Sequence, residues 1–203
     1  MFLNNITRII NTAINLFIMK IAIYGSASGD IKDDSIQKAK LIGKLLAEKG
    51  NTIVTGASTG LPFEAVKKAK ENNGKCIGFA PAISLVEQKE KNLPYEEFDE
   101  IFFVPKEYEY ANEHMVLTKY RNVSTAAFVD AAIIIGGRIG TMNEFTNMYD
   151  IGKPIGVLTG TGGIADKVIK DTIKAANKPG PKVIFESEPE KLIDQLLSLL
   201  SST

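Results

Sequence analysis

Short apolar runs alternate with longer amphipathic segments along most of the chain. Apolar runs of this length are typical of buried strands, and segments with an apolar residue every three or four positions are typical of helices facing a core. The pattern predicts strands at 21–24, 52–55, 75–79, 100–104, 131–135, 154–158 and 183–185. It predicts helices at 34–49, 62–73, 110–127, 141–149, 164–176 and 189–200.

The regular alternation of strand and helix predicts an α/β fold. Crossover helices between parallel strands are right-handed, so we expect a Rossmann-like, doubly wound parallel sheet of about seven strands with helices on both faces. The wholly apolar run 131–135 is expected inside the sheet, and the charged stretch 84–99 is expected to be a surface loop. No repeat or linker marks a second domain, so residues 19–203 are predicted to form a single nucleotide-binding domain.

Residues 1–18 form an N-terminal extension with apolar residues at helical spacing. It is either a packing helix or a dispensable segment in front of Met19. A signal peptide is rejected because the small residues Ser26 and Ala27, near its expected cleavage site, belong to a glycine turn. Polar Asn11 and Asn15 interrupt the stretch well short of a membrane span. We therefore predict a cytoplasmic protein without a membrane partner.

Charge and composition exclude several classes of function. The chain has 24 basic and 24 acidic residues, a balance that argues against nucleic-acid binding by bulk positive charge. It has one cysteine, Cys76, and one histidine, His114, too few for a disulfide framework or a structural zinc site. We therefore predict no nucleic-acid partner, no metal and no cofactor.

Glycine-rich turns follow four of the predicted strands, at 25–29, 56–60, 136–141 and 160–163. In parallel sheets the ligand lies beyond the carboxyl ends of the strands, where glycines let backbone amides approach an anion and helix N-termini add donors. Each turn alone is also compatible with an ordinary strand-to-helix connection. Together they predict a site for a nucleotide or another phosphate-bearing small molecule.

The third turn carries a resemblance to a known family. Asp130 follows Arg121 by 9 residues and Glu144 follows it by 23, around Ala-Ala-Ile-Ile-Ile and Gly-Gly-Arg-Ile-Gly-Thr-Met-Asn-Glu. This resembles the signature of the LOG ("lonely guy") family, also known as putative lysine decarboxylases, and the turns at 25–29 and 55–61 are similar to that family's first two glycine loops. Asn122, Gly136 and Arg138 depart from it, toward a wider branch that includes molybdenum-cofactor carrier proteins.

The resemblance implies hydrolysis of the N-glycosidic bond of a nucleoside 5′-monophosphate, giving free base and ribose 5-phosphate. Arg121 and Glu144 would be catalytic. The alternative is a non-catalytic nucleotide or molybdenum-cofactor carrier. The phosphate or nucleotide would be bound by Gly25, Ser26, Gly56, Ala57, Gly60, Gly136, Gly137, Arg138, Gly140 and Thr141. The family also implies a homodimer or higher homo-oligomer, for which apolar Val116, Phe128 and Met148 are suitable.

Structural roles compete with these assignments. Thr141 and Glu144 fit a capping box, in which the pair closes the start of a helix. Arg121 has Asp130 and Glu113 as other possible partners. His114 lies seven residues before Arg121, on the same helix face. It either lines the pocket or is a surface residue.

Overall fold

The computed structural model describes residues 18–29 and 31–202, so most of the N-terminal extension lies outside the described residues. The strands are β1 (Lys20–Gly25), β2 (Thr52–Thr55), β3 (Cys76–Phe79), β4 (Glu100–Phe102), β5 (Ala131–Ile135), β6 (Ile155–Leu158) and β7 (Val183–Glu186). The helices are α2 (Asp33–Glu48), α3 (Leu61–Glu71), α4 (Leu85–Glu90), α5 (His114–Phe128), α6 (Ile139–Ile151), α7 (Gly163–Lys167), α8 (Ile169–Ala176) and α9 (Pro189–Ser201).

The strands form one seven-stranded sheet in the order β4-β3-β2-β1-β5-β6-β7. Every neighbouring pair is parallel. This confirms the predicted α/β fold, and β5 lies inside the sheet between β1 and β6, as its apolar sequence predicts. The strand order reverses between β1 and β5. In doubly wound sheets a crevice for ligands opens beyond the strand ends at this point.

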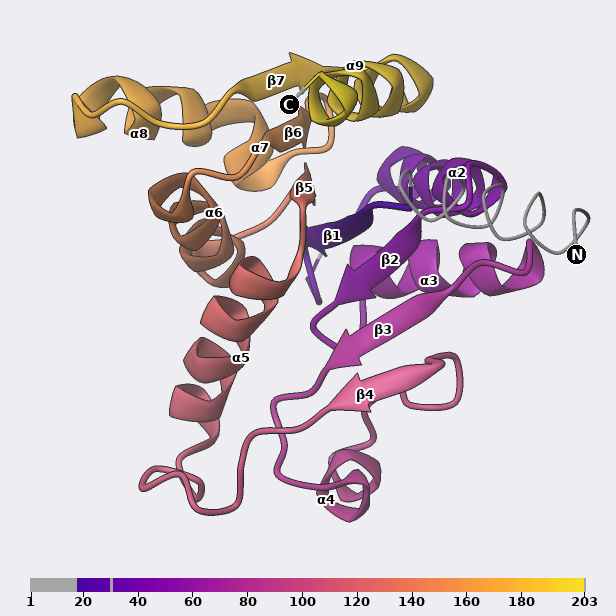
Figure 1. The fold of residues 1–203 in the computed structure, drawn as a ribbon, viewed down its shortest axis with the longest axis vertical. Coiled ribbons are helices and arrows are strands. Elements are labelled where there is room, and N and C mark those ends of the chain that lie inside the picture. The colour runs from indigo at the N-terminus through magenta and orange to yellow at the C-terminus, as the bar shows by residue number, and fades with distance from the viewer. Residues whose placement is uncertain (1–17, 30, 203) are drawn as a thin grey trace, which may run out of the picture.

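Helices cover both faces of the sheet (Figure 1). The side chains of β1 point alternately to one face and the other. Ile21 and Ile23 pack into a core with α2, α3 and α9. Ala22 and Tyr24 point the other way, into a core with residues of α5, α6, α7 and α8. Successive strand residues face opposite sides, so the side chain that precedes Gly25 lies on the α5–α6 side.

Three predicted elements differ from the structure. The 84–99 stretch contains α4, because Ser84 Oγ accepts a hydrogen bond from the Glu87 amide and Glu87 Oε2 accepts one from the Ile83 amide. This reciprocal cap stabilises a helix too short to show a periodicity. The helix predicted over 110–127 begins at His114, after hydrogen-bonded turns. The helix predicted over 164–176 is divided into α7 and α8 at Val168, where φ is −103°.

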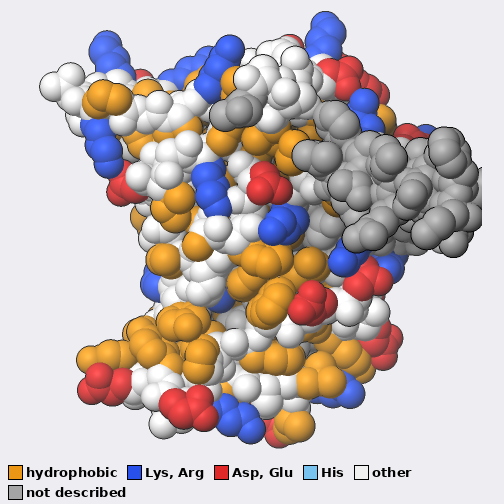
Figure 2. All heavy atoms as spheres, in the orientation of Figure 1, with side chains coloured by type: hydrophobic (Ala, Val, Ile, Leu, Met, Phe, Trp, Pro, Cys, Tyr) orange, Lys and Arg blue, Asp and Glu red, His pale blue; other side chains and the backbone are white. Residues whose placement is uncertain are grey.

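The apolar residues proposed for an oligomer interface are placed differently from one another. Met148 is fully buried, so it cannot contribute to a surface. Phe128 packs against Phe79 and Phe102, with ring centroids 5.2 and 5.5 Å away. Met115 and Val123 are the exposed large hydrophobic residues of α5. Hydrophobic side chains gather near the start of this helix in the space-filling view (Figure 2). Homo-oligomer formation stays a prediction.

Within the described ranges, no helix combines the length and the apolar character needed to cross a bilayer.

Candidate functional site

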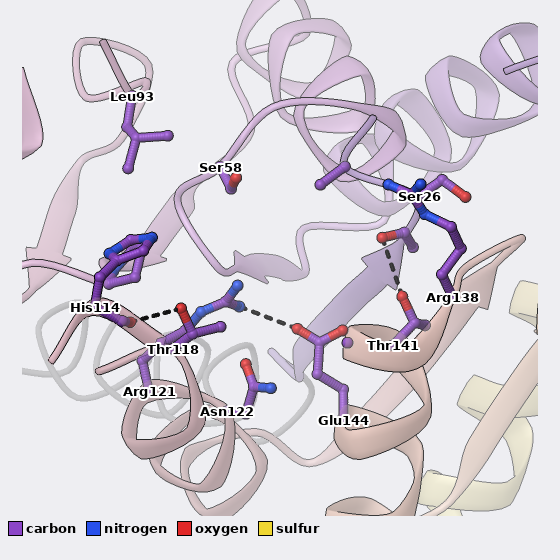
Figure 3. Close-up of a pocket in the computed structure, with 14 residues that line it drawn as sticks. Ser26, Ser58, Leu93, His114, Thr118, Arg121, Asn122, Arg138, Thr141 and Glu144 are labelled. Atoms are coloured by element: carbon purple, nitrogen blue, oxygen red, sulfur yellow. Dashed lines mark hydrogen bonds and ion pairs between the residues drawn. The ribbon is translucent and has the colours of Figure 1, made fainter. Parts of the chain in front are cut away.

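A cavity of about 260 Å³ opens at the carboxyl ends of β1 and β5, where the strand order reverses (Figure 3). Seven of the predicted site residues line it: Gly25, Ser26, Arg121, Arg138, Gly140, Thr141 and Glu144. Gly56, Ala57, Gly60, Gly136 and Gly137 are not among its lining residues. The structure therefore brings the first and third glycine turns, with Ser58 of the second, together with α5 and α6 around one cavity.

Arg121 and Glu144 form an ion pair between α5 and α6. Arg121 Nη1 lies 3.0 Å from Glu144 Oε1, and the two side chains are only 12% and 9% exposed. Both line the cavity, and they face each other across its middle in Figure 3. Arg121 Nε is buried without a hydrogen-bond partner among the described residues. The rigid fork of the guanidinium thus holds the carboxylate in place.

Gly56 provides the space that Arg121 occupies. A Cβ built on Gly56 would lie 1.7 Å from Arg121 Nη1 and 2.3 Å from its Cζ. No side chain at this position is compatible with the guanidinium where it stands. The second glycine turn, which lines the cavity only through Ser58, supports the site from behind the ion pair.

Burial raises the pKa of Glu144 to about 7, and the positive charge and hydrogen bond of Arg121 only partly oppose that shift. The carboxyl therefore exchanges its proton near neutral pH, a property that general acids and bases require. Burial and the charge of Glu144 also raise the pKa of Tyr24 well above its usual value, although Arg121 opposes this. The Tyr24 hydroxyl is buried and unpaired within the described part of the chain.

The raised pKa of Glu144 predicts how stability depends on pH. Between its ordinary value of 4.5 and about 7, the folded protein keeps a proton that the unfolded chain has released, so stability falls as pH rises through this window. Relative to Glu144→Gln, the wild type should lose up to about 3 kcal/mol of unfolding free energy between about pH 4 and pH 8. Urea denaturation of both proteins measures the difference.

Glu71 provides a control of opposite sign for that measurement. Its exposed carboxylate accepts a hydrogen bond from Lys68, which lowers the pKa of Glu71. Relative to Glu71→Gln, the wild type should gain stability as the pH rises. A wild type that also gains stability relative to Glu144→Gln would contradict the shift at Glu144.

The N-terminus of α6 supplies unpaired donors to the cavity. The first helical bond runs from the Met142 amide to the Arg138 carbonyl, and no described residue accepts a hydrogen bond from the amides of Gly140 and Thr141. A Cβ on Gly140 would meet no atom within 4 Å, so the approach to this turn is open. Arg138 lies beside it, exposed, with Nη2 donating to Ser28 Oγ at 2.7 Å. Free amides, the helix dipole and this cation together favour an anion.

Hydroxyl side chains connect the glycine turns to one another. Ser26 Oγ accepts from the Gly137 amide at 2.9 Å, and Thr161 Oγ1 accepts from the Gly136 amide at 2.8 Å. The Gly137 amide, which the sequence predicts to cradle phosphate, therefore already has an acceptor within the protein. The turns are held in place by these bonds, and the amides of Gly140 and Thr141 at the start of α6 are left open.

The fourth glycine turn carries its own acceptor. Asp166 accepts hydrogen bonds from the amides of Gly160 and Gly162 through its two carboxylate oxygens, at 2.6 and 2.8 Å. None of the residues of this turn lines the cavity. The turn is therefore structural in this chain.

The competing structural roles can now be decided. The capping-box interpretation is wrong, because α6 starts at Ile139 and Thr141 Oγ1 donates to the Gly25 carbonyl at 3.1 Å. Arg121 pairs with Glu144 and not with Asp130. Asp130 Oδ2 accepts from the Lys20 amide at 2.7 Å, which joins the starts of β1 and β5.

Ala27 and Ser58 line the cavity from the predicted glycine turns 25–29 and 56–60, whereas four other lining residues were not predicted as part of the site: Pro81, Leu93, Thr118 and Asn122. Thr118 could have been found from its helical spacing, four residues after His114. Pro81 and Leu93 follow β3 in irregular segments, where the sequence has no local signal. His114 lines the cavity, which favours the first of its two interpretations.

Comparison with known proteins identifies the family. A model described as the SLOG cluster4 family matches residues 18–193. The chain belongs to this family. All the predicted site residues lie within the matched region. A curated, uncharacterized protein of Archaeoglobus fulgidus is 26% identical over 141 residues, 70% of this chain and 80% of the relative.

Solved structures share the fold of this SLOG cluster4 protein. The molybdenum cofactor binding protein of Rippkaea orientalis is 20% identical, with a TM-score of 0.69 over 90% of this chain and 98% of that one. The molybdenum cofactor carrier protein of Chlamydomonas reinhardtii is 22% identical, with a TM-score of 0.67 over 91% and 99%. DNA processing protein A of Helicobacter pylori, described as binding single-stranded DNA, is 19% identical, with a TM-score of 0.62 over 94% and 84%.

At these identities the structural similarity concerns the fold alone. It supports the Rossmann-like fold predicted from the sequence, while the LOG assignment stays a prediction. The fold is shared with a DNA-binding protein, so the prediction that no nucleic acid is bound depends on the balanced charge of this SLOG cluster4 chain.

Proposed function

We propose that this SLOG cluster4 protein binds a nucleoside 5′-monophosphate and hydrolyses its N-glycosidic bond. One observation carries the proposal: the buried Arg121–Glu144 pair opens onto the same cavity as the uncapped N-terminus of α6. The anion-binding N-terminus of α6 and the acid–base group of Glu144 are thereby within reach of one small ligand.

The phosphate is placed at the start of α6. There the amides of Gly140 and Thr141 donate to its oxygens and Arg138 exchanges its neutral partner Ser28 for a charged one. Arg121 is already neutralised by Glu144, so Arg138 provides the uncompensated charge at this end. Hydrogen bonds to charged groups are about twice as strong as neutral ones, which gives a reason for this exchange.

The sugar then lies beside Glu144. The Glu144 carboxylate takes a proton from a water molecule, and the water oxygen bonds to C1′ as the C1′–N bond breaks. The electron pair of that bond goes to the base nitrogen, which is protonated from solvent, and the products are free base and ribose 5-phosphate. The negative charge of Glu144 stabilises the positive charge that develops on the sugar, and Arg121 keeps the carboxylate in position.

The test is incubation of the purified protein with AMP, GMP, CMP and UMP, followed by chromatography of the released base and assay of ribose 5-phosphate. We expect equal amounts of both products from at least one monophosphate, and none from the nucleoside that lacks the phosphate. Release of base from the nucleoside as fast as from the monophosphate would contradict a phosphate-binding site.

Arg138→Gln tests the phosphate end. The variant should weaken monophosphate binding about tenfold, because a charge-assisted hydrogen bond is lost. Isothermal titration calorimetry measures this Kd. Lys167→Gln is the matched control, since Lys167 is exposed on α7 and does not line the cavity. Equal Kd values for Arg138→Gln and wild type would place the phosphate elsewhere.

A second candidate function is a non-catalytic carrier of a nucleotide or of the molybdenum cofactor. The similarity to two proteins described as binding or carrying that cofactor favours it. The donor-rich α6 terminus fits a phosphorylated ligand of either kind. Among residues 18–29 and 31–202, no group of three or more His, Cys, Asp and Glu side chains could hold a metal ion, so a metal would depend on its own organic ligand. A carrier would bind the ligand tightly and release no base in the same assay.

A further inference from the structure

The end of the cavity opposite Arg138 has a different chemical character. It is lined by Ser58, Pro81, Leu93, His114 and Thr118, and Figure 3 shows His114 and Leu93 on the far side of the Arg121–Glu144 pair from Arg138. Two apolar side chains therefore stand beside two hydroxyls and an imidazole. A flat heterocycle with polar atoms on its edge matches this lining.

The imidazole of His114 is held in one tautomer by Lys91. Lys91 Nζ lies 3.1 Å from His114 Nδ1, and Lys91 also contacts Glu87. An ammonium group can only donate, so Nδ1 accepts and the ring proton of neutral His114 is on Nε2. No described residue pairs with Nε2. The ring thus keeps one N–H donor for a ligand.

Thr118 supplies the complementary group. Its Oγ1 donates to the His114 carbonyl at 3.1 Å, one turn earlier on α5. Its hydrogen is therefore engaged and its lone pairs remain as acceptors. His114 and Thr118 together offer one donor and one acceptor, as the edge of a nucleobase requires.

The opposite wall is fixed by a buried side chain. Gln88, which is fully buried, donates from Nε2 to the Ala57 carbonyl at 2.8 Å and to the Pro94 carbonyl at 2.9 Å. These two bonds hold the backbone next to Ser58 and Leu93. The pocket end is consequently organised before a ligand arrives, which lowers the entropic cost of binding.

We propose that this end of the cavity recognises the base and that His114 determines base selectivity, by donating from Nε2 to an acceptor on the base. The inference depends on the proposed function, since it assumes that the phosphate lies at α6. Lys91 is a positioning residue, because it acts on the base only through the His114 ring.

Calorimetric titration of wild type, His114→Ala and His114→Gln with AMP, GMP, CMP, UMP and ribose 5-phosphate tests the proposal. His114→Ala should weaken binding of the tightest-binding nucleotide about tenfold, the effect of one lost hydrogen bond. It should leave ribose 5-phosphate, which has no base, within about twofold of wild type. His114→Gln should recover most of the affinity, since its amide N–H can replace Nε2–H.

A matched pair of lysine variants tests the role of Lys91. Lys91→Met releases the tautomer and should reduce the preference among the four nucleotides. Lys89→Met is the control, because Lys89 lies in the last turn of α4, two residues before Lys91, but over the Tyr95 ring, 4.6 Å from its centroid. Its variant should retain the wild-type preference.

Three outcomes would overturn the inference. If His114→Ala weakens binding of ribose 5-phosphate as much as binding of the nucleotides, His114 does not recognise the base. If it leaves nucleotide affinities and their order unchanged while the wild type binds and cleaves a monophosphate, base recognition lies elsewhere and the proposed function stands. If the wild type binds neither nucleotides nor ribose 5-phosphate, both proposals fail.

Discussion

Glu144→Gln is expected to lower kcat/KM for monophosphate hydrolysis by about 10²- to 10⁴-fold, the usual effect of losing a general base. The amide keeps the shape of the side chain but can neither accept the proton of water nor carry a negative charge beside the sugar. The Kd of the monophosphate should stay within a few-fold of wild type, because the phosphate is held at α6. Rates of base release and calorimetric Kd values separate the two effects.

The pH profile of the wild type gives a second measure of the same carboxylate. A base must be deprotonated to act, and the pKa of Glu144 is raised to about 7 by burial. The value of kcat/KM should therefore fall as the pH decreases through about 7. Glu113→Gln, on the exposed residue before α5, should behave as wild type. Retention of the wild-type rate by Glu144→Gln would show that Glu144 is not the general base.

Gly56→Ala is expected to reduce kcat/KM by about 10²-fold without touching the ligand, because small displacements of catalytic groups have effects of this size. The added methyl would lie 1.7 Å from Arg121 Nη1, so the guanidinium must leave its place. Glu144 then loses its hydrogen-bond donor, and the pKa of its carboxyl should rise further. The acid limb of the pH profile should move to higher pH.

A double-mutant cycle distinguishes this mechanism from general damage to the fold. In Arg121→Ala the guanidinium is absent, so adding Gly56→Ala should lower kcat/KM little further. If the losses of kcat/KM in the two single variants instead add in full, Gly56 does not act through the position of Arg121. Circular dichroism and urea denaturation of each variant establish that the sheet remains folded.

The parts of the fold that could be predicted are those fixed by local pattern. The run 131–135 is apolar throughout and has the interior position that its sequence predicts, and the spacing from Arg121 to Glu144 corresponds to two side chains in contact. In both cases the information lies within one or two neighbouring elements.

Residues whose partners come from distant segments could not be assigned in this way. Ser26 was predicted to bind the ligand and Thr161 lies in the fourth glycine turn, yet their hydroxyls accept hydrogen bonds from the amides of Gly137 and Gly136. Their roles depend on how the loops meet in space, which periodicity does not report. The same applies to Lys91 and His114, 23 residues apart, which meet because α4 forms where a loop was expected.

Asp166 has a consequence for how glycine turns are interpreted. Its carboxylate occupies the amides of Gly160 and Gly162 in the manner of a bound anion, so the chain provides an internal substitute for phosphate at one turn and leaves the start of α6 accessible at another. Two turns of similar composition thus differ in whether an acidic side chain follows within reach. The residues just downstream of a glycine turn, more than its glycines, indicate whether the turn is available to a solute.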